Sequence, residues 1–278
     1  MAVRIVTDST SDLPESLAKE LNITVVPLKV LFGEEMYRDG IDLSKADFYK
    51  KMAEHKQLPT TAQINPGEFL EVFQNILTER NEIVGIFISS KLSGTYSSAV
   101  VAREQLGKAR IHLVDSETTT FGLGSLVILA ARMAQQNKSA EEIVAKLEIA
   151  KKRVFFYGVV NTLENLRKGG RLSATAAVAG TLLGIKPIVT IKNGEVTVAA
   201  KARGQKKAFA WILEQMEKYG DLEDKTVLIA HAAAPAEMWE FKKLLEERFN
   251  PAEIVEIEIG AVVGTHSGQG CIGIGFLT

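Results

Sequence analysis

The stretch IVGIFISSKLSGTY, residues 83–96, joins a buried strand to a helix and decides the fold class. Its first part, residues 83–88, is a continuous apolar run of strand length, and a helix is expected to begin near Gly94. A further strand is expected at residues 110–114, before an apolar helix that begins at Phe121. This alternation of strands and helices predicts an α/β fold with a parallel sheet and helices on both of its faces.

The same pattern begins the chain. Residues 3–7 are apolar and β-branched, as in a strand, and the polar run DSTSD at residues 8–12 follows them. Asp12 and Glu15 have the spacing of a capping box, so we expect Asp12 to cap a helix there. Another strand is expected at residues 24–31. Strand, turn and helix thus follow one another from the N-terminus.

The pattern changes in the second half of the chain. After a strand at residues 154–160, the dipeptide Asn193-Gly194 separates two strand-like segments, which is typical of a β-hairpin. We therefore predict an N-terminal parallel-sheet α/β domain over residues 1–155 and a smaller C-terminal α/β domain with a mixed sheet over residues 156–278. The remaining strands of that mixed sheet are expected at residues 227–230, 254–259 and 272–276.

The composition excludes several classes of function. Lysine and arginine total 33 against 34 acidic residues, so no net positive field attracts nucleic acid or an anionic membrane surface. The most apolar internal stretch, residues 121–133, carries Arg132 and is too short to span a bilayer. Cys271 is the only cysteine, which excludes an internal disulfide and fits a reducing compartment. We expect a cytoplasmic protein without an integral membrane segment.

Two candidate binding groups lie where helices are expected to begin. Ser93 follows a buried strand at the edge of an open α/β sheet where ligands bind, and helix N–H groups there favour an anion. Thr61 precedes a helix expected to begin near Asn65 and Pro66. Each hydroxyl could bind a carboxylate or a phosphate, or could simply cap its helix. The local sequence leaves both interpretations open.

A histidine flanked by glycines is the third candidate. The segment GTHSGQG, residues 264–270, is expected to be a loop between two strands. Glycine allows the backbone to approach a ligand closely, and a loop histidine is less often part of a core. His266 is therefore a candidate site residue, whereas His231, at a strand end, is expected to be structural.

Two arginines complete the candidates. Arg171 follows the helix-terminating pair Gly169-Gly170 and is expected to project outward. Arg203 ends the second strand of the predicted hairpin. Either side chain could bind an anion or be solvated, as most surface arginines are.

Taken together, these segments resemble the DegV family along the whole chain. The ordered combination carries the resemblance, and its parts are DSTSDL at residues 8–13, YRDG at 37–40, TTAQ at 60–63, LSGTY at 92–96, LRKGGR at 166–171 and GTH at 264–266. The family's fold pairs an N-terminal α/β domain with a smaller C-terminal α/β domain, and the two enclose a fatty acid. Members similar to this chain act as fatty-acid-binding subunits of a bacterial fatty acid kinase, whose ATP-binding subunit is a different protein.

The resemblance implies a carrier that binds a long-chain fatty acid and presents its carboxylate for acyl-phosphate formation, with no activity of its own. It implies no cofactor and no metal. The tail pocket is expected to include the apolar helix from Phe121 and the small-residue stretch 174–184. Two positions depart from the family pattern, Ala62 where serine is frequent and Gln269 where proline is common. The carboxylate would be bound by Thr61, Ser93, Gly94 and His266, and the kinase subunit would face Arg171 and Arg203.

Two other classes of protein compete with this interpretation. A serine acyl hydrolase would use Ser93 as nucleophile and His266 as base, although Leu92-Ser93-Gly94 lacks the Gly-x-Ser-x-Gly elbow. A self-sufficient kinase would need a phosphate-binding loop, and neither a Gly-x-x-x-x-Gly-Lys-Ser/Thr motif nor a Gly-x-Gly-x-x-Gly motif after a strand is present. The four histidines show no metal-ligand spacing.

Overall fold

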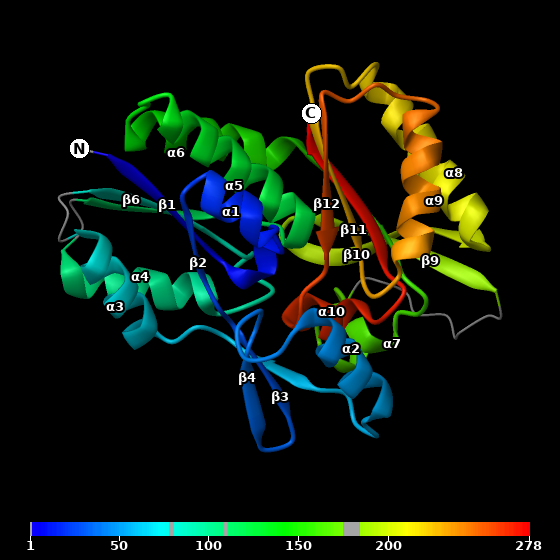
Figure 1. Ribbon diagram of the computed structural model, residues 1–278, viewed down its shortest axis with the longest axis horizontal. Helices are drawn as coiled ribbons and strands as arrows, with labels where there is room; N and C mark the ends of the chain where they lie inside the picture. Colours follow the sequence, from blue (N-terminus) through cyan, green and yellow to red (C-terminus); the bar gives the residue numbers. More distant parts are fainter. Residues whose placement is uncertain (1, 78–80, 108–109, 175–183) are drawn as a thin grey trace.

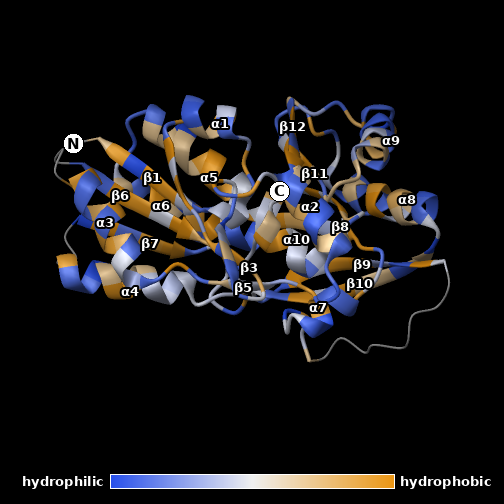
Figure 2. Ribbon diagram, turned by 60° about the horizontal axis from the view of Figure 1, so that its bottom comes forward, coloured by the Kyte–Doolittle hydropathy of each residue, from blue (hydrophilic) through white to orange (hydrophobic). Residues whose placement is uncertain are grey.

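A computed structural model describes residues 2–77, 81–107, 110–174 and 184–278. Within these residues, two large sheets with their helices lie side by side, and a small third sheet lies below their junction (Figure 1). Figure 2 shows apolar residues along the strands of both large sheets. The strands therefore supply most of the core, as the apolar runs of the sequence predict.

The N-terminal half is built on a four-stranded parallel sheet. Its elements are β1 (Val3–Asp8), α1 (Glu15–Glu20), β2 (Ile23–Val26), α3 (Pro66–Leu77), β6 (Glu82–Phe87), α4 (Thr95–Leu106), β7 (Ile111–Asp115), α5 (Thr120–Gln135) and α6 (Ala140–Ala150). The strand order is β2-β1-β6-β7. Figure 1 shows α3 and α4 below the sheet and α5 and α6 above it. The predicted parallel sheet with helices on both faces is confirmed.

The C-terminal half is built on a six-stranded mixed sheet in the order β10-β9-β8-β13-β11-β12. Only β11 and β12 pair in parallel within it, and the other neighbours are antiparallel. This confirms the predicted mixed sheet, and β8 spans the boundary predicted at residue 155. The elements are β8 (Val154–Val159), α7 (Glu164–Lys168), β9 (Ile185–Lys192), β10 (Glu195–Arg203), α8 (Gln205–Met216), β11 (Thr226–His231), α9 (Pro235–Glu246), β12 (Glu253–Glu258), α10 (Ala261–Ser267) and β13 (Ile272–Leu277).

The predicted hairpin is confirmed at β9 and β10. Lys192 pairs with Glu195, and the two residues between them have positive φ angles, 52° at Asn193 and 81° at Gly194. A two-residue turn of this kind matches the twist of paired strands, and Asn-Gly is its preferred sequence.

Helix α5 lies between the two large sheets. It packs on β1 and β6 of the first sheet and on β8, β11 and β13 of the second. Both sides of the helix are therefore buried, which explains why the sequence from Phe121 is apolar without a polar face. The helix forms one wall of the junction between the halves.

The small sheet corrects two expectations about residues 24–62. Its strands are β3 (Lys29–Phe32), β4 (Glu35–Arg38) and β5 (Thr60–Ala62), and α2 (Lys45–Glu54) lies between β4 and β5 in the chain. The single strand predicted at residues 24–31 is two strands, because Pro27, which has no backbone N–H, separates β2 from β3. Thr61 pairs with Val30 within this sheet. It does not cap α3, since the Asn65 side chain accepts the Glu68 N–H at 3.0 Å.

The capping box predicted at Asp12 is wrong. Helix α1 begins at Glu15 after Pro14, and no side chain caps it. Asp12 instead adopts a left-handed backbone conformation with φ 54°, which aspartate tolerates better than most residues. Its carboxylate accepts the backbone N–H of Gly260 at 2.8 Å, so it contacts the opposite half of the protein.

Candidate functional site

A cavity of about 350 Å³ lies where α5, α10 and the two large sheets meet. This volume is within the range of small-molecule sites. Phe121 of α5 lines it as predicted, whereas residues 175–183 of the second predicted segment lie outside the described part of the chain. An apolar ligand would therefore be well matched to the wall, whose apolar members are Leu28, Ala62, Ile88, Leu92, Phe121, Phe156, Val160, Leu166, Val189, Val196, Ile259, Val262, Val263 and Cys271.

The nominated binding residues are part of this wall. Thr61, Ser93, Gly94 and His266 all line the cavity, although 205 residues separate Thr61 from His266 in the chain. The Thr61 hydroxyl and the His266 Nε2 atom are 3.0 Å apart and hydrogen-bonded. The structure therefore brings together the four residues that the sequence nominates for a carboxylate.

His266 lies on a helix and not in the expected loop. Residues 261–267 form α10, in which the Thr265 hydroxyl donates to the Ala261 carbonyl at 2.8 Å. The helix has only seven residues, of which three are β-branched and one is glycine, so local propensity gives little sign of it. The expectation that Gly264 lets the backbone approach a ligand is also wrong. The Phe48 and Tyr49 rings occupy the space that a side chain at Gly264 would need.

The imidazole of His266 is held in its neutral form. Burial, with a smaller contribution from the charge of Arg171, lowers the pKa of His266 to about 4. Nδ1 is buried and has no hydrogen-bond partner among the described residues, and it faces Gly169, where any side chain would overlap the ring. At neutral pH the ring therefore offers one N–H donor. Gly169 is a site residue that sequence reasoning assigned only to a helix end.

Helix α4 begins directly after Ser93 and Gly94, close to the predicted start near Gly94. Gly94 is the residue before α4, and the Ser93 hydroxyl accepts the Thr95 N–H at 3.3 Å and shares a hydrogen bond of 2.9 Å with the Thr95 hydroxyl. A side chain at Gly94 would overlap the Gln63 amide. Gln63, whose Nε2 atom donates to the Ser98 hydroxyl at 3.0 Å, is a second neighbour that sequence reasoning missed.

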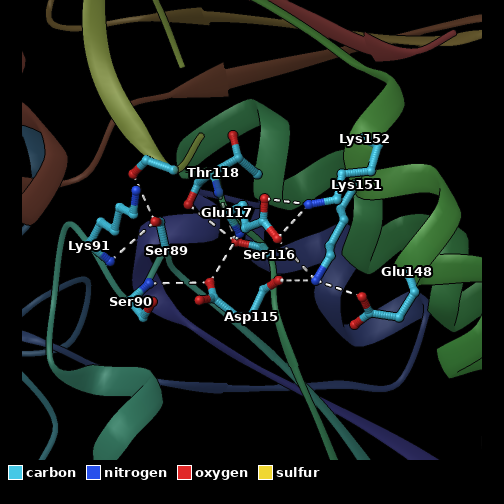
Figure 3. Close-up of polar contacts among 11 residues, drawn as sticks. Ser89, Ser90, Lys91, Asp115, Ser116, Glu117, Thr118, Glu148, Lys151 and Lys152 are labelled. Atoms are coloured by element: carbon cyan, nitrogen blue, oxygen red, sulfur yellow. Dashed lines mark hydrogen bonds and ion pairs between the residues drawn. The ribbon is translucent and has the colours of Figure 1, made fainter. Parts of the chain in front are cut away.

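The loop that carries Ser93 is anchored by the polar network shown in Figure 3. The Ser90 N–H donates to the Asp115 carboxylate at 3.2 Å, and the Ser89 N–H donates to the Thr118 carbonyl at 2.9 Å. The Ser89 hydroxyl donates to the Gly194 carbonyl at 2.8 Å, so the β9–β10 turn is tied to the same loop. Ser93 is thus presented by a fixed backbone.

A buried lysine completes that network. Lys151 has a side chain that is 8% exposed and forms ion pairs with Glu148 at 2.7 Å and Glu117 at 3.3 Å. Its ammonium group also donates to the Asp115 carbonyl at 3.2 Å (Figure 3). A charge buried this far needs such partners, and they hold the end of β7 beside the Ser93 loop.

The two arginines have different positions. Arg171 turns inward, contrary to expectation, because its Nε atom donates to the Leu92 carbonyl at 3.2 Å and Nη1 to the Gly169 carbonyl at 2.6 Å. It lines the cavity beside Ser93. Arg203 is exposed at the end of β10 and does not line the cavity.

A second, polar hollow of about 720 Å³ adjoins the cavity. The two share Thr61, Arg171 and His266 as lining residues. Lys56, Lys168 and Glu164 also border the hollow. The polar part of the apolar cavity therefore lies next to a wide polar recess.

The arrangement does not favour the hydrolase alternative. The Ser93 hydroxyl contacts Thr95 and the His266 ring contacts Thr61, so no Ser93–His266 hydrogen bond is among those of the described residues. Over the same residues, no group of three or more histidine, cysteine, aspartate or glutamate side chains is arranged to hold a metal ion. No described helix is long and apolar enough to cross a bilayer.

Fold and site define an α/β protein with two sheets around an apolar cavity whose polar end is built from hydroxyls and a neutral imidazole. The chain belongs to the DegV family. The family's sequence model, described as "Uncharacterised protein, DegV family", matches residues 2–278. A DegV domain-containing protein of Caldanaerobacter subterraneus is 40% identical over 275 residues, which cover 99% of this chain and 98% of the relative.

Solved structures agree with this assignment. A DegV family protein from Thermus thermophilus, described by its fatty acid binding, superposes with a TM-score of 0.93 at 33% identity and full coverage of both chains. DegV from Bacillus subtilis, described as a fatty acid binding protein, gives a TM-score of 0.89 at 32% identity, covering 100% of this chain and 99% of that one. The fold expected from the resemblance is thereby confirmed.

Proposed function

We propose that this protein binds a long-chain fatty acid and presents its carboxylate to a separate ATP-dependent kinase subunit, which forms the acyl phosphate. The tail lies between an N-terminal domain of residues 1–155 and a C-terminal domain of residues 156–278. The observation that carries the proposal is the largely apolar cavity of about 350 Å³, which shares Thr61, Arg171 and His266 with a polar hollow of about 720 Å³. An amphipathic molecule with one charged end fits that division.

The similar structures support the choice of ligand. Those from Thermus thermophilus and Bacillus subtilis are described as fatty-acid-binding, and one from Eubacterium ventriosum, 27% identical with a TM-score of 0.89, as binding stearic acid. We extend this class of ligand to the present chain because its cavity has the matching apolar wall and polar end.

The free energy of binding is expected to come mainly from the tail. About 15 methylene groups at about 0.8 kcal/mol each contribute about 12 kcal/mol before the cost of association. A charge-assisted hydrogen bond to the carboxylate contributes about 1.5 to 3 kcal/mol. Thr61 and Ser93 therefore position the head group more than they retain the lipid.

The head-group geometry follows from the donors present. The hydroxyls of Thr61 and Ser93 and the backbone at Gly94 line this part of the cavity, and the neutral His266 ring orients the Thr61 hydroxyl through their hydrogen bond of 3.0 Å. A carboxylate accepts several such bonds at once. With the carboxylate there, its oxygens face the polar hollow, where the γ-phosphate of ATP on the partner would approach.

The partner surface is proposed around that hollow. Arg171 borders it, and Arg203, which does not line the hollow, is proposed as a separate contact at the exposed end of β10. Both arginines suit a partner that carries phosphate groups. The chain itself needs no cofactor in this scheme, and its place is the cytoplasm, where ATP and the kinase subunit are found.

The substitution Ser93→Ala separates the two roles. We expect acyl-phosphate formation with the kinase subunit to fall about 10- to 100-fold, because misplacement of the reacting group is costly. The amount of lipid that co-purifies should change little, since the tail is untouched. Ser97→Ala, at an exposed serine of α4, is the matched control. Equal loss of lipid and of turnover in Ser93→Ala would contradict the proposed division of roles.

Labelling distinguishes the hydrolase alternative. A fluorophosphonate probe reacts with an activated serine, and we expect no labelling of the wild-type protein. Labelling that Ser93→Ala abolishes would replace the carrier by a hydrolase. The absence of lipid in wild-type protein, shown by mass spectrometry after denaturation, would reject fatty acid binding itself.

A further inference from the structure

The turn between β12 and α10 is held by four side chains from the N-terminal half. They contact consecutive residues, and each contact joins positions more than 200 residues apart in the chain. We call these four side chains the clasp. Lys45 donates to the Glu258 carbonyl, Tyr49 donates to the Ile259 carbonyl at 2.9 Å, Asp12 accepts the Gly260 N–H at 2.8 Å, and Asp39 accepts the Ala261 N–H at 2.9 Å.

The two carboxylates of the clasp converge on Gly260. A side-chain carbon at that glycine would lie 2.9 Å from Asp12 Oδ1 and 3.0 Å from Asp39 Oδ1. Both acids are buried, with 4% and 5% exposure, and Lys45 is the cation whose charge acts on both. Burying two like charges together destabilises the folded protein, and apolar residues of similar size at these positions would cost less free energy. The pair is therefore better explained by what it positions than by stability.

The clasp positions α10. This helix has only seven residues, too few to be stable alone, so its orientation must come from tertiary contacts. Its N-terminal N–H groups are fixed by the clasp, and at its other end the Asn165 amide donates to the Thr265 carbonyl at 3.2 Å. Between these ends the helix presents Val262, Val263 and His266 to the cavity.

We propose that Asp12 and Asp39 are positioning residues for the head group, because they set the orientation of α10 and thereby place the His266 ring against Thr61. Neither carboxylate lines the cavity. The effect of the clasp on ligand binding rests on the proposed function, but the placement of the His266 ring can be tested without ligand. It gives a role to two sequence motifs, DSTSD and YRDG, that the carboxylate site does not use.

The first test observes His266 in the ligand-free protein. Protein labelled with ¹⁵N-histidine contains four histidines, and His266→Asn identifies the signal of interest. In Asp12→Ala and Asp39→Ala we expect the His266 ring shifts to change and its pKa to rise toward the ordinary value. Asp12→Asn and Asp39→Asn, which keep an acceptor oxygen for the N–H group, should restore the wild-type signal.

The second test measures the head group with palmitate labelled by ¹³C at its carboxyl carbon. The alanine variants should bind it about 10-fold more weakly, as expected for one lost head-group hydrogen bond, and shift its signal. Gly260→Ala wedges the acids apart without removing them and should act in the same direction. Unchanged His266 and carboxyl signals in all three of these variants would overturn the proposal.

A control separates positioning from general loss of stability. Glu253 at the start of β12 pairs with Arg132 of α5 at 2.5 Å, so Glu253→Gln also weakens a contact between the halves on the same strand. We expect this variant to leave both signals unchanged. Equal effects of Glu253→Gln and Asp39→Ala would mean that any loosening displaces α10, and would also overturn the proposal. Failure of the wild type to bind palmitate would refute the proposed function alone.

Discussion

Replacing Asp12 by asparagine is expected to change how stability depends on pH. Burial, opposed in part by Lys45, raises the pKa of Asp12 from 3.8 to about 7. Between these values the folded protein holds a proton that the unfolded chain has released. Stability therefore falls as pH rises through this window, and the full cost is present above pH 7. Asparagine does not ionise, so the variant escapes this cost.

The magnitude follows from the shift. About 3 pH units at about 1.4 kcal/mol each give a cost of about 4 kcal/mol above pH 7. The unfolding free energy of Asp12→Asn relative to wild type should therefore rise by about 3 kcal/mol between pH 4.5 and pH 7.5, which is most of the full cost, and then change little. His266, whose lowered pKa makes stability fall in acid, is present in both proteins and cancels.

Urea unfolding at intervals from pH 4.5 to pH 8 measures this difference. Asp42→Asn is the control, because hydrogen bonds from Arg38 hold the pKa of Asp42 at about 2, and the group is ionised throughout that range in both states. Its difference from wild type should not vary with pH. A flat difference for Asp12→Asn as well would show that Asp12 is ionised at pH 4.5, and would refute the argument from burial.

Two further predictions concern glycines of the site. Gly158→Val should shorten the longest fatty acid retained, measured by mass spectrometry of a panel of chain lengths, because Gly158 lines the cavity. A side-chain carbon there would have ordinary contacts with Val189 at 3.5 Å, with Cys271 at 3.9 Å and with the Ile272 carbonyl at 3.9 Å, and the larger side chain would take up cavity volume. The unfolding free energy of this variant should not fall, since a glycine within a strand costs about 0.5 to 1 kcal/mol. Unchanged retention of the longest fatty acids would contradict the expected shortening of the cavity. Gly169→Ala should displace the His266 ring, because a side-chain carbon at Gly169 would overlap that ring. We expect palmitate binding to weaken about 10-fold. A wild-type affinity measured by calorimetry would contradict this prediction.

The large features of the fold could be predicted because they repeat along the chain. The apolar runs of β6 and β8 and the Asn193-Gly194 turn carry strong local signals, and the structure confirms them. The short elements could not be predicted. Helix α10 and strand β5 have seven and three residues, and tertiary contacts decide their conformation against weak local propensity.

Asp12 shows the same limit for a single residue. Its spacing from Glu15 satisfies a capping pattern, but a buried N–H at Gly260 offers it a partner that lies 248 residues away. The spacing of residues in a sequence predicts hydrogen-bond partners only within a few positions along the chain. The roles of Gly169 and Gln63 were missed for the same reason, since both contacts are made by segments that the sequence places far apart.

The candidate site could be nominated by residue type but not assembled. Thr61, Ser93 and His266 were nominated through a family pattern and local turns, and their common cavity became visible only in three dimensions. Arg171 was expected to face outward, because it follows the two glycines that end a helix. Its actual acceptors include the Leu92 carbonyl, which belongs to the segment that carries Ser93.

The glycines around the site have one physical role in common. At Gly94, Gly169, Gly260 and Gly264, the space of a missing side chain is filled by a side chain from a distant segment, respectively Gln63, His266, the two acids of the clasp, and Tyr49. None of these four has a positive φ angle, so backbone strain does not explain the choice of glycine. The glycines instead allow distant segments to pack closely against α10, α7 and the segment that carries Ser93. It follows that hydroxyl substitutions should alter how the carboxylate is bound, whereas glycine substitutions should alter whether its binding groups meet at all.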